Sequence, residues 1–254
     1  REEFVKEVTD GLVTPPQYFP KNAVMNKMGY DSIDGILEQG VIALDVKEFN
    51  QTVEKNGALI IDARSNEDFA EAHIPGSWFV GIDDNFAPWV GALVTDLKTP
   101  IVFLADEGKE EEVVIRLSRV GYDNTLGFLE GGIEAWKSAG GETESVMEVT
   151  ATEFAQSFDE SVNLLDVRKE SEFKAQHVEG ARNFPLDFIS ETIENLDKET
   201  SFYVHCAGGY RSMIAVSILK ANGFKNLTNI QGGFEAIQET DLPLTEQKEQ
   251  ITML

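Results

Sequence analysis

A single cysteine lies in a segment that could carry nucleophilic chemistry. Cys206 is the only cysteine among 254 residues, so the chain cannot form an internal disulfide. It is followed by Ala207-Gly208-Gly209-Tyr210-Arg211-Ser212. The two glycines allow backbone angles that turn several N–H groups toward one concavity. The cation of Arg211 and the start of a helix at the same place favour the thiolate over the thiol. We therefore predict that Cys206 is a nucleophile at neutral pH.

The segments on either side of Cys206 predict a strand and a helix that would position it. Residues 201–205 are aromatic and β-branched, as in a buried strand, and residues 212–222 form an apolar helix that Gly223 closes. Further strands are expected at 163–167 and 227–230, with helices at 169–176 and from Phe234. Strands alternating with helices predict an α/β fold, a parallel sheet with helices on both faces. Cys206 would lie at the carboxyl end of a strand, where such sheets bind ligands.

The chain contains this unit twice. Five residues of the segment 59–76 recur at one constant offset in the segment 163–180: Asp62, Arg64, Phe69, His73 and Gly76 match Asp166, Arg168, Phe173, His177 and Gly180. A Gly-Gly motif at 130–135 recurs at 231–236. The repeat predicts one domain at 41–143 and another at 146–245, joined by a polar seam at 138–145 that contains glycine. An N-terminal segment, 1–40, and a polar tail, 246–254, belong to neither.

The first unit lacks the nucleophile. Depending on one gap, Cys206 aligns with Leu104 or Ala105, and the acidic Asp106 and Glu107 follow. Negative charge there would oppose a thiolate and an anionic ligand alike, so we expect the first domain to be inactive.

The Asp-x-Arg motif is also present in the first unit, which lacks the cysteine. Asp166 and Arg168 are therefore expected to support the cysteine loop as an ion pair rather than to contact a substrate. Substrate contact by Arg168 is the alternative.

In combination, the Asp-x-Arg motif, the cysteine loop and the Gly-Gly motif resemble the tandem rhodanese family of sulfurtransferases over residues 41–240. The resemblance implies that Cys206 takes a sulfane sulfur from thiosulfate or a persulfide and passes it to a thiol or cyanide. Arg211 would then stabilise charge. The loop residues Ala207, Gly208, Gly209, Tyr210 and Ser212 would bind the substrate. For the Tyr210 side chain, packing against a neighbouring surface is an equal alternative.

Two other functions remain open. Related loops in rhodanese-like phosphatases and arsenate reductases have five residues between cysteine and arginine, whereas Cys206 and Arg211 are separated by four. The shorter loop favours sulfur over a tetrahedral oxyanion. The other alternative is a regulatory or docking module, in which the loop senses sulfur without transferring it.

A second resemblance concerns the N-terminal segment. Residues 11–20, which are rich in proline, and residues 26–30 are similar to the end of the metallo-β-lactamase-fold region in bacterial persulfide dioxygenase–rhodanese fusions. The metal-binding H-x-H-x-D-H motif of those proteins is absent from this sequence. We therefore expect a metallo-β-lactamase-fold domain of the same parent chain as a partner.

Composition excludes several classes of function. The net charge of −24 opposes binding to nucleic acid or to an anionic membrane. No apolar run approaches the ~20 residues that span a bilayer, and the sequence does not start with a signal-peptide pattern, so a cytoplasmic location is expected. The three histidines form no metal-binding motif, so no metal or cofactor is expected in this chain.

Overall fold

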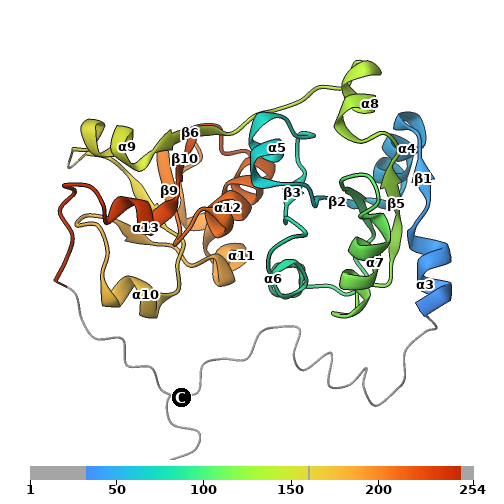
Figure 1. Ribbon diagram of the computed structural model, residues 1–254, viewed down its shortest axis with the longest axis horizontal. Coiled ribbons are helices and arrows are strands. Elements are labelled where there is room, and N and C mark those ends of the chain that lie inside the picture. Colours follow the sequence, from blue (N-terminus) through green and yellow to red (C-terminus); the bar gives the residue numbers. More distant parts are fainter. Residues whose placement is uncertain (1–32, 160, 247–254) are drawn as a thin grey trace, which may run out of the picture.

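A computed structural model describes residues 33–159 and 161–246, which form two α/β domains (Figure 1). Each domain has one five-stranded sheet, with the strand orders β1-β5-β4-β2-β3 and β6-β10-β9-β7-β8. The order is the same in both, and every strand pair is parallel. This confirms the predicted fold class. The proline-rich segment and residues 247–254 of the predicted tail lie outside the described residues.

Helix α3 lies before residue 41, the start predicted from the repeat for the first domain, and packs against α7 and β5. The elements of the first domain are α3 (Ile33–Gly40), β1 (Ala43–Leu44), α4 (Val46–Asn56), β2 (Leu59–Asp62), α5 (Asn66–Glu71), β3 (Trp78–Phe79), α6 (Phe86–Leu93), β4 (Ile101–Leu104), α7 (Glu110–Ser118), β5 (Thr125–Leu129) and α8 (Gly132–Ser138).

The second domain follows without a further helix in the seam. Its elements are β6 (Met147–Thr150), α9 (Ala151–Ser157), β7 (Leu164–Asp166), α10 (Glu170–Ala175), β8 (Arg182–Asn183), the 3-10 helix η1 (Leu186–Phe188), α11 (Ile189–Thr192), the 3-10 helix η2 (Ile193–Asn195), β9 (Phe202–His205), α12 (Tyr210–Ala221), β10 (Leu227–Gln231) and α13 (Gly233–Ile237).

Alternating side chains explain why both faces of each sheet are covered. In β4, Ile101 and Phe103 join one hydrophobic cluster, whereas Val102 and Leu104 join another with residues of α4 and α8. Successive side chains of a strand point to opposite faces, so an entirely apolar strand needs helices on both sides.

Corresponding helices of the two domains begin with the same capping chemistry. Asp45 accepts a hydrogen bond from the Glu48 N–H, and Glu48 accepts one from the Asp45 N–H. Thr150 and Glu153 form the same reciprocal pair at the start of α9. Such capping boxes satisfy N–H groups that have no partner within the helix, so each sequence sets the point at which its helix starts.

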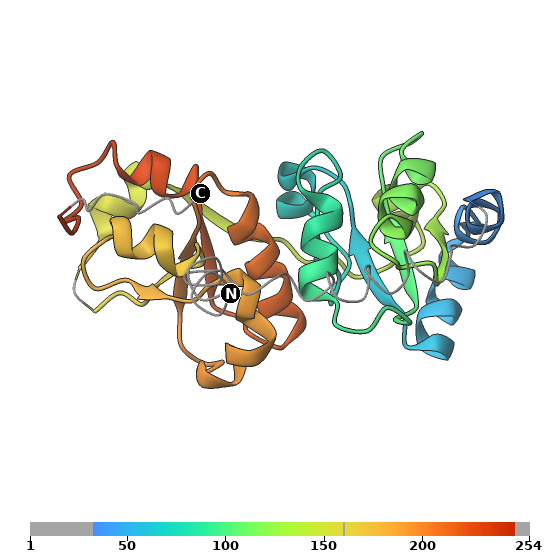
Figure 2. The ribbon, with the colours of Figure 1, turned by 90° about the horizontal axis from the view of Figure 1, so that it is seen from below.

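Helix α12 belongs to the second domain and lies on the side of it that faces the first domain (Figures 1 and 2). Its residues from Ser212 to Leu219 are all buried. One side packs against β9 and β10 of its own sheet, and another packs against β3 and α5 of the first domain. The helix starts at Tyr210, two residues before the predicted start at Ser212, so Tyr210 and Arg211 belong to its first turn. Among the described residues, no helix is long and apolar enough to cross a membrane.

Candidate active site

Cys206 lies directly after β9, at the start of the loop that leads into α12. Its side chain is almost fully buried. The backbone N–H of Gly209 donates a hydrogen bond to Sγ, with N and S 3.1 Å apart. Gly209 has a φ of 111°, a conformation that favours glycine. The glycine thus turns the chain back so that a backbone donor faces the sulfur, where it would favour negative charge.

The first turn of α13 binds the backbone carbonyl groups at the start of this loop. The N–H of Phe234 donates to the carbonyl oxygen of Cys206 at 2.7 Å, and the N–H of Glu235 donates to that of Ala207 at 3.0 Å. Gly233 allows this approach, because a Cβ there would lie 2.4 Å from the Ala207 oxygen. The Gly-Gly motif therefore fixes the loop carbonyls, a role that the sequence motif alone did not reveal.

Arg211 forms a two-pronged ion pair with Glu172 of α10. Its two terminal nitrogens lie 2.7 and 2.8 Å from the two carboxylate oxygens. The hydrogen bond to Glu172 raises the pKa of Arg211, and burial opposes it. Burial acts to raise the pKa of Glu172, but the hydrogen bonds and charge of Arg211 bring that pKa below its ordinary value. Arg211 is therefore held beside the loop as one half of an ion pair, and not as a free cation.

The sequence prediction missed Glu172, although the repeat contains a signal for it. The residues that correspond to Glu172 and Arg211 in the first domain are Asp68 and Glu110, which cannot form this pair. The carboxylate is kept as Asp68, but an acidic residue replaces the arginine in the domain that lacks the cysteine.

Asp166 and Arg168 also form a pair, next to β7. Arg168 donates to both carboxylate oxygens of Asp166 and, at 2.8 Å, to the carbonyl oxygen of Gln176. Arg64 binds Asp62 and the carbonyl oxygen of Ala72 in the same way. The pair therefore joins the end of a strand to the end of the following helix in both domains, which supports the structural interpretation.

His205 is buried immediately before Cys206. Its Nδ1 lies 3.1 Å from the carbonyl oxygen of Cys206, and its Nε2 lies 3.8 Å from a carboxylate oxygen of Asp166. Burial lowers the pKa of His205, although Asp166 opposes this. The ring is therefore neutral, and its contacts are with the backbone and the Asp166 side, as expected for a residue that faces away from the sulfur.

Two loop side chains predicted to bind substrate are engaged within the protein. The hydroxyl of Tyr210 donates to the carbonyl oxygen of Gly81 in the first domain at 3.1 Å. The hydroxyl of Ser212 donates to the carbonyl oxygen of Gly209 at 2.9 Å. The Tyr210 side chain therefore packs against a neighbouring surface, which was the alternative to substrate binding. Substrate binding by residues 207–212 stays a prediction that rests on their backbone N–H groups.

The strand register shows which residue of the first domain corresponds to Cys206. Asp62 pairs with Leu104 in the first sheet as Asp166 pairs with His205 in the second. Ala105 is therefore the counterpart of Cys206, which decides between the two alignments. The first domain retains a turn glycine, Gly108 with a φ of 86°, but it has a methyl group in place of the thiol.

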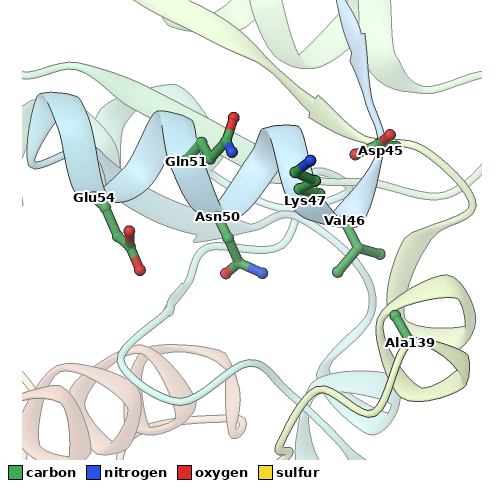
Figure 3. A pocket seen from close by; sticks show the side chains of 7 residues that line it. All are labelled: Asp45, Val46, Lys47, Asn50, Gln51, Glu54 and Ala139. Carbon is green, nitrogen blue, oxygen red and sulfur yellow. The ribbon is translucent and has the colours of Figure 1, made fainter.

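A surface hollow of about 620 Å³ lies elsewhere, on the first domain. Figure 3 shows that its side chains come mainly from α4, with Ala139 at one edge. Its polar groups are Asp45, Lys47, Asn50, Gln51 and Glu54, none of which is a strong nucleophile. The Cys206 loop therefore remains the candidate active site. Within residues 33–159 and 161–246, no three His, Cys, Asp or Glu side chains are grouped so that they could hold a metal ion.

Comparison with known proteins gives two matches to one family model. The rhodanese-like domain model matches residues 45–139 and again residues 150–240. YrkF of Bacillus subtilis is 33% identical over 91 residues, which cover 35% of this chain and 49% of YrkF. The thiosulfate sulfurtransferase GlpE of Tolumonas auensis is 36% identical over 75 residues, which cover 30% of this chain and 71% of GlpE. A solved thiosulfate sulfurtransferase of Pseudomonas aeruginosa is 20% identical with a TM-score of 0.36, over 83% of this chain and 44% of that one.

Proposed function

The chain belongs to the rhodanese family, and from this premise we propose that it is a sulfurtransferase with Cys206 as its sulfur-carrying nucleophile. The observation that carries the proposal is the hydrogen bond from the Gly209 N–H to Sγ, within a loop that places the cysteine at the carboxyl end of β9. Relatives named thiosulfate sulfurtransferases support the reaction class. The donor would be thiosulfate or a persulfide, and the acceptor a thiol or cyanide.

The proposed reaction consists of two displacements at sulfur. The Cys206 thiolate attacks the outer sulfur of the donor, so that a new S–S bond forms and the donor S–S bond breaks. The bonding electrons leave with sulfite from thiosulfate, or with a thiolate from a persulfide. The acceptor then attacks the outer sulfur of the Cys206 persulfide and regenerates the thiolate. No electrons are gained or lost overall, so the reaction needs no redox cofactor.

The loop offers groups suited to both steps. The Gly209 N–H would stabilise negative charge on Sγ of Cys206 in the resting enzyme, and again when the acceptor takes the outer sulfur and the Cys206 thiolate is the leaving group. The Arg211–Glu172 pair would present a fixed dipole to the departing anion. Because this pair has little net charge, we propose that backbone donors rather than a lone cation provide most of the anion stabilisation.

Mass spectrometry tests this proposal directly, because Cys206 is the only thiol. Incubation with thiosulfate or glutathione persulfide should add ~32 Da to the protein, through transfer of one sulfur atom to the nucleophile. Subsequent cyanide should remove this mass and yield thiocyanate. The Cys206→Ser variant is the control and should gain nothing. If neither donor modifies the wild-type protein, or if the variant retains turnover, the proposal is wrong.

We further propose that a metallo-β-lactamase-fold domain of the same parent chain is a partner. The support is the resemblance of residues 11–20 and 26–30, which lie outside the described residues. The sequence of the reading frame upstream of Arg1 is the test. An H-x-H-x-D-H motif there would support the partner, and its absence would remove it. Partner binding without any turnover by the wild type would instead favour the docking-module function.

A further inference from the structure

Tyr210 connects the catalytic loop to the domain that has no nucleophile. It stands next to Arg211 in the loop and first turn of α12, yet its ring packs edge-on against Phe79 of β3, with ring centres 5.7 Å apart. Its hydroxyl donates to the Gly81 carbonyl oxygen at 3.1 Å. Burial and the nearby carboxylate of Asp84 raise the pKa of Tyr210 above its ordinary value. The hydroxyl therefore remains a protonated donor at neutral pH.

The segment that contains Gly81, which accepts the hydrogen bond from Tyr210, is itself held in place by a residue of α7. Arg116 of α7 donates to the carbonyl oxygen of Ile82 at 2.5 Å, and its other nitrogen pairs with Glu112. Gly81 is closely packed, because a Cβ there would lie 3.1 Å from the Arg64 carbonyl oxygen and 3.1 Å from the Phe79 ring. The Gly81 carbonyl is thus a fixed acceptor on a supported turn, and not the tip of a free loop.

A second hydroxyl of α12 reaches the same strand. Ser217 accepts a hydrogen bond from the Phe79 N–H at 2.9 Å and donates to the Ile214 carbonyl oxygen at 2.8 Å. Ser217 lies seven residues after Tyr210, so both side chains share one face of the helix. Both contacts reach the first domain, but Tyr210 lies at the loop that carries Cys206, whereas Ser217 lies two turns away.

We propose that the first domain serves as the positioning element of the active site, and that Tyr210 is the positioning residue through which it acts. The proposal rests on the sulfurtransferase function proposed above. The first domain fixes Tyr210 from outside the loop, as the first turn of α13 fixes the carbonyls of Cys206 and Ala207. With both sides held, the Gly209 N–H stays directed at Sγ. The domain has lost its own nucleophile but retains this function.

The test compares Tyr210→Phe with Ser217→Ala. Each variant loses one hydroxyl and one hydrogen bond between the domains, and Tyr210→Phe keeps the ring against Phe79. We expect the kcat of sulfur transfer to fall about tenfold or more in Tyr210→Phe, since small misplacements of a reacting group are costly. The KM for the donor should stay unchanged, because the side chain does not contact substrate. Ser217→Ala should lose stability but keep the wild-type kcat.

Hydrogen exchange provides a readout that does not depend on turnover. The amides of residues 207–209 should exchange faster in Tyr210→Phe than in the wild type and in Ser217→Ala. Equal kcat losses in both variants, a rise in KM alone, or unchanged loop exchange would overturn the proposal. If the wild type transfers no sulfur, the proposed function fails, while the exchange comparison still decides whether the first domain holds the loop.

Discussion

The sulfur of Cys206 receives a backbone hydrogen bond from Gly209, and the nearest arginine of its loop is already paired. Removing the carboxylate partner therefore changes two properties of the site at once. It leaves the guanidinium of Arg211 without its bidentate acceptor, and it increases the positive charge beside the sulfur. The geometry of the guanidinium matters more than its charge if its role is to present fixed donors.

We predict that Glu172→Gln lowers the free energy of unfolding by about 1–2 kcal/mol, the range between an exposed ion pair and a hydrogen-bonded charge. Sulfur transfer should also slow, because Arg211 loses its fixed orientation. Urea denaturation and thiocyanate production measure the two effects. Glu170→Gln is the matched control on the same helix, since its pair with Lys174 is largely exposed. Similar losses in both variants would show that the Arg211 pair has no special role.

The stability difference between the wild type and Glu172→Gln should depend on pH. The pKa of Glu172 is lowered in the folded protein, so its carboxylate adds stability above the unfolded value of about 4.3. That contribution is lost as the pH falls through the lowered folded value. The difference between the two proteins should therefore be full at neutral pH and shrink toward zero below about pH 4. A constant difference down to pH 3 would contradict this assignment.

At this scale the sequence predicted the turn around Cys206 but not the residues that hold it. Cys206 and its glycines are neighbours in the chain, so their local pattern is sufficient to predict the turn. Glu172 lies 39 residues from Arg211, and Gly81 lies 129 residues from Tyr210. Such contacts depend on how elements pack, and no local pattern carries them. Comparison within the repeat gave only a partial signal, because the position of Glu172 keeps a carboxylate, Asp68, and only the arginine is replaced.

Both domains contain the Gly-Gly turn, but they differ in how closely this turn packs against the neighbouring loop. Gly132 and Gly233 have the same φ of 57°. A Cβ on Gly233 would collide with the Cys206 loop, whereas a Cβ placed on Gly132 would meet no described atom within 4 Å apart from its chain neighbours and the backbone of its own helix. The first domain thus keeps the turn and has lost the close approach between its helix and its loop.

These two glycines provide a matched pair of variants. Gly132→Ala should cost only the strain of a left-handed alanine, about 1–2 kcal/mol. Gly233→Ala carries the same strain and must also move either α13 or the loop carbonyls, so it should abolish most of the persulfide formation at Cys206. Unfolding free energies and the mass of the modified protein measure the two effects. Equal consequences for activity would show that α13 does not position the loop.

The three inner strands of the second sheet and the helices α10, α12 and α13 were predicted from their apolar patterns, whereas the two edge strands, β6 and β8, and the helix α9 were not. The start of α12 was predicted two residues late, since Tyr210 and Arg211 resemble loop residues when read locally. Their place in the helix follows from the positive φ of Gly209. The run from Ser212 to Leu219, in which only the two small serines are polar, did contain information about packing. A helix with no polar face must be covered on all sides, which here requires the first domain.

The two domains share one hydrophobic cluster, which extends from Phe79 and Phe86 of the first to Met213 and Leu219 of the second. A parallel sheet and its helices could form in either domain alone. The first domain, however, covers the side of α12 that its own sheet leaves open. The loss of either domain would expose apolar surface on the other, so the molecule should behave as one cooperative unit.

We predict that both domains unfold in a single transition. All three tryptophans, Trp78, Trp89 and Trp136, lie in the first domain, and the only cysteine lies in the second. Tryptophan fluorescence and the reaction of the Cys206 thiol with a chromogenic disulfide therefore report the two domains separately in one urea titration. Leu219→Ala removes a fully buried side chain of the shared cluster and should cost about 2–5 kcal/mol. It should lower the fluorescence midpoint of the first domain as much as the thiol midpoint of the second. A fluorescence transition that stays in place while the thiol becomes accessible would mean that the domains have separate cores, and that the first domain cannot hold the active-site loop through a common fold.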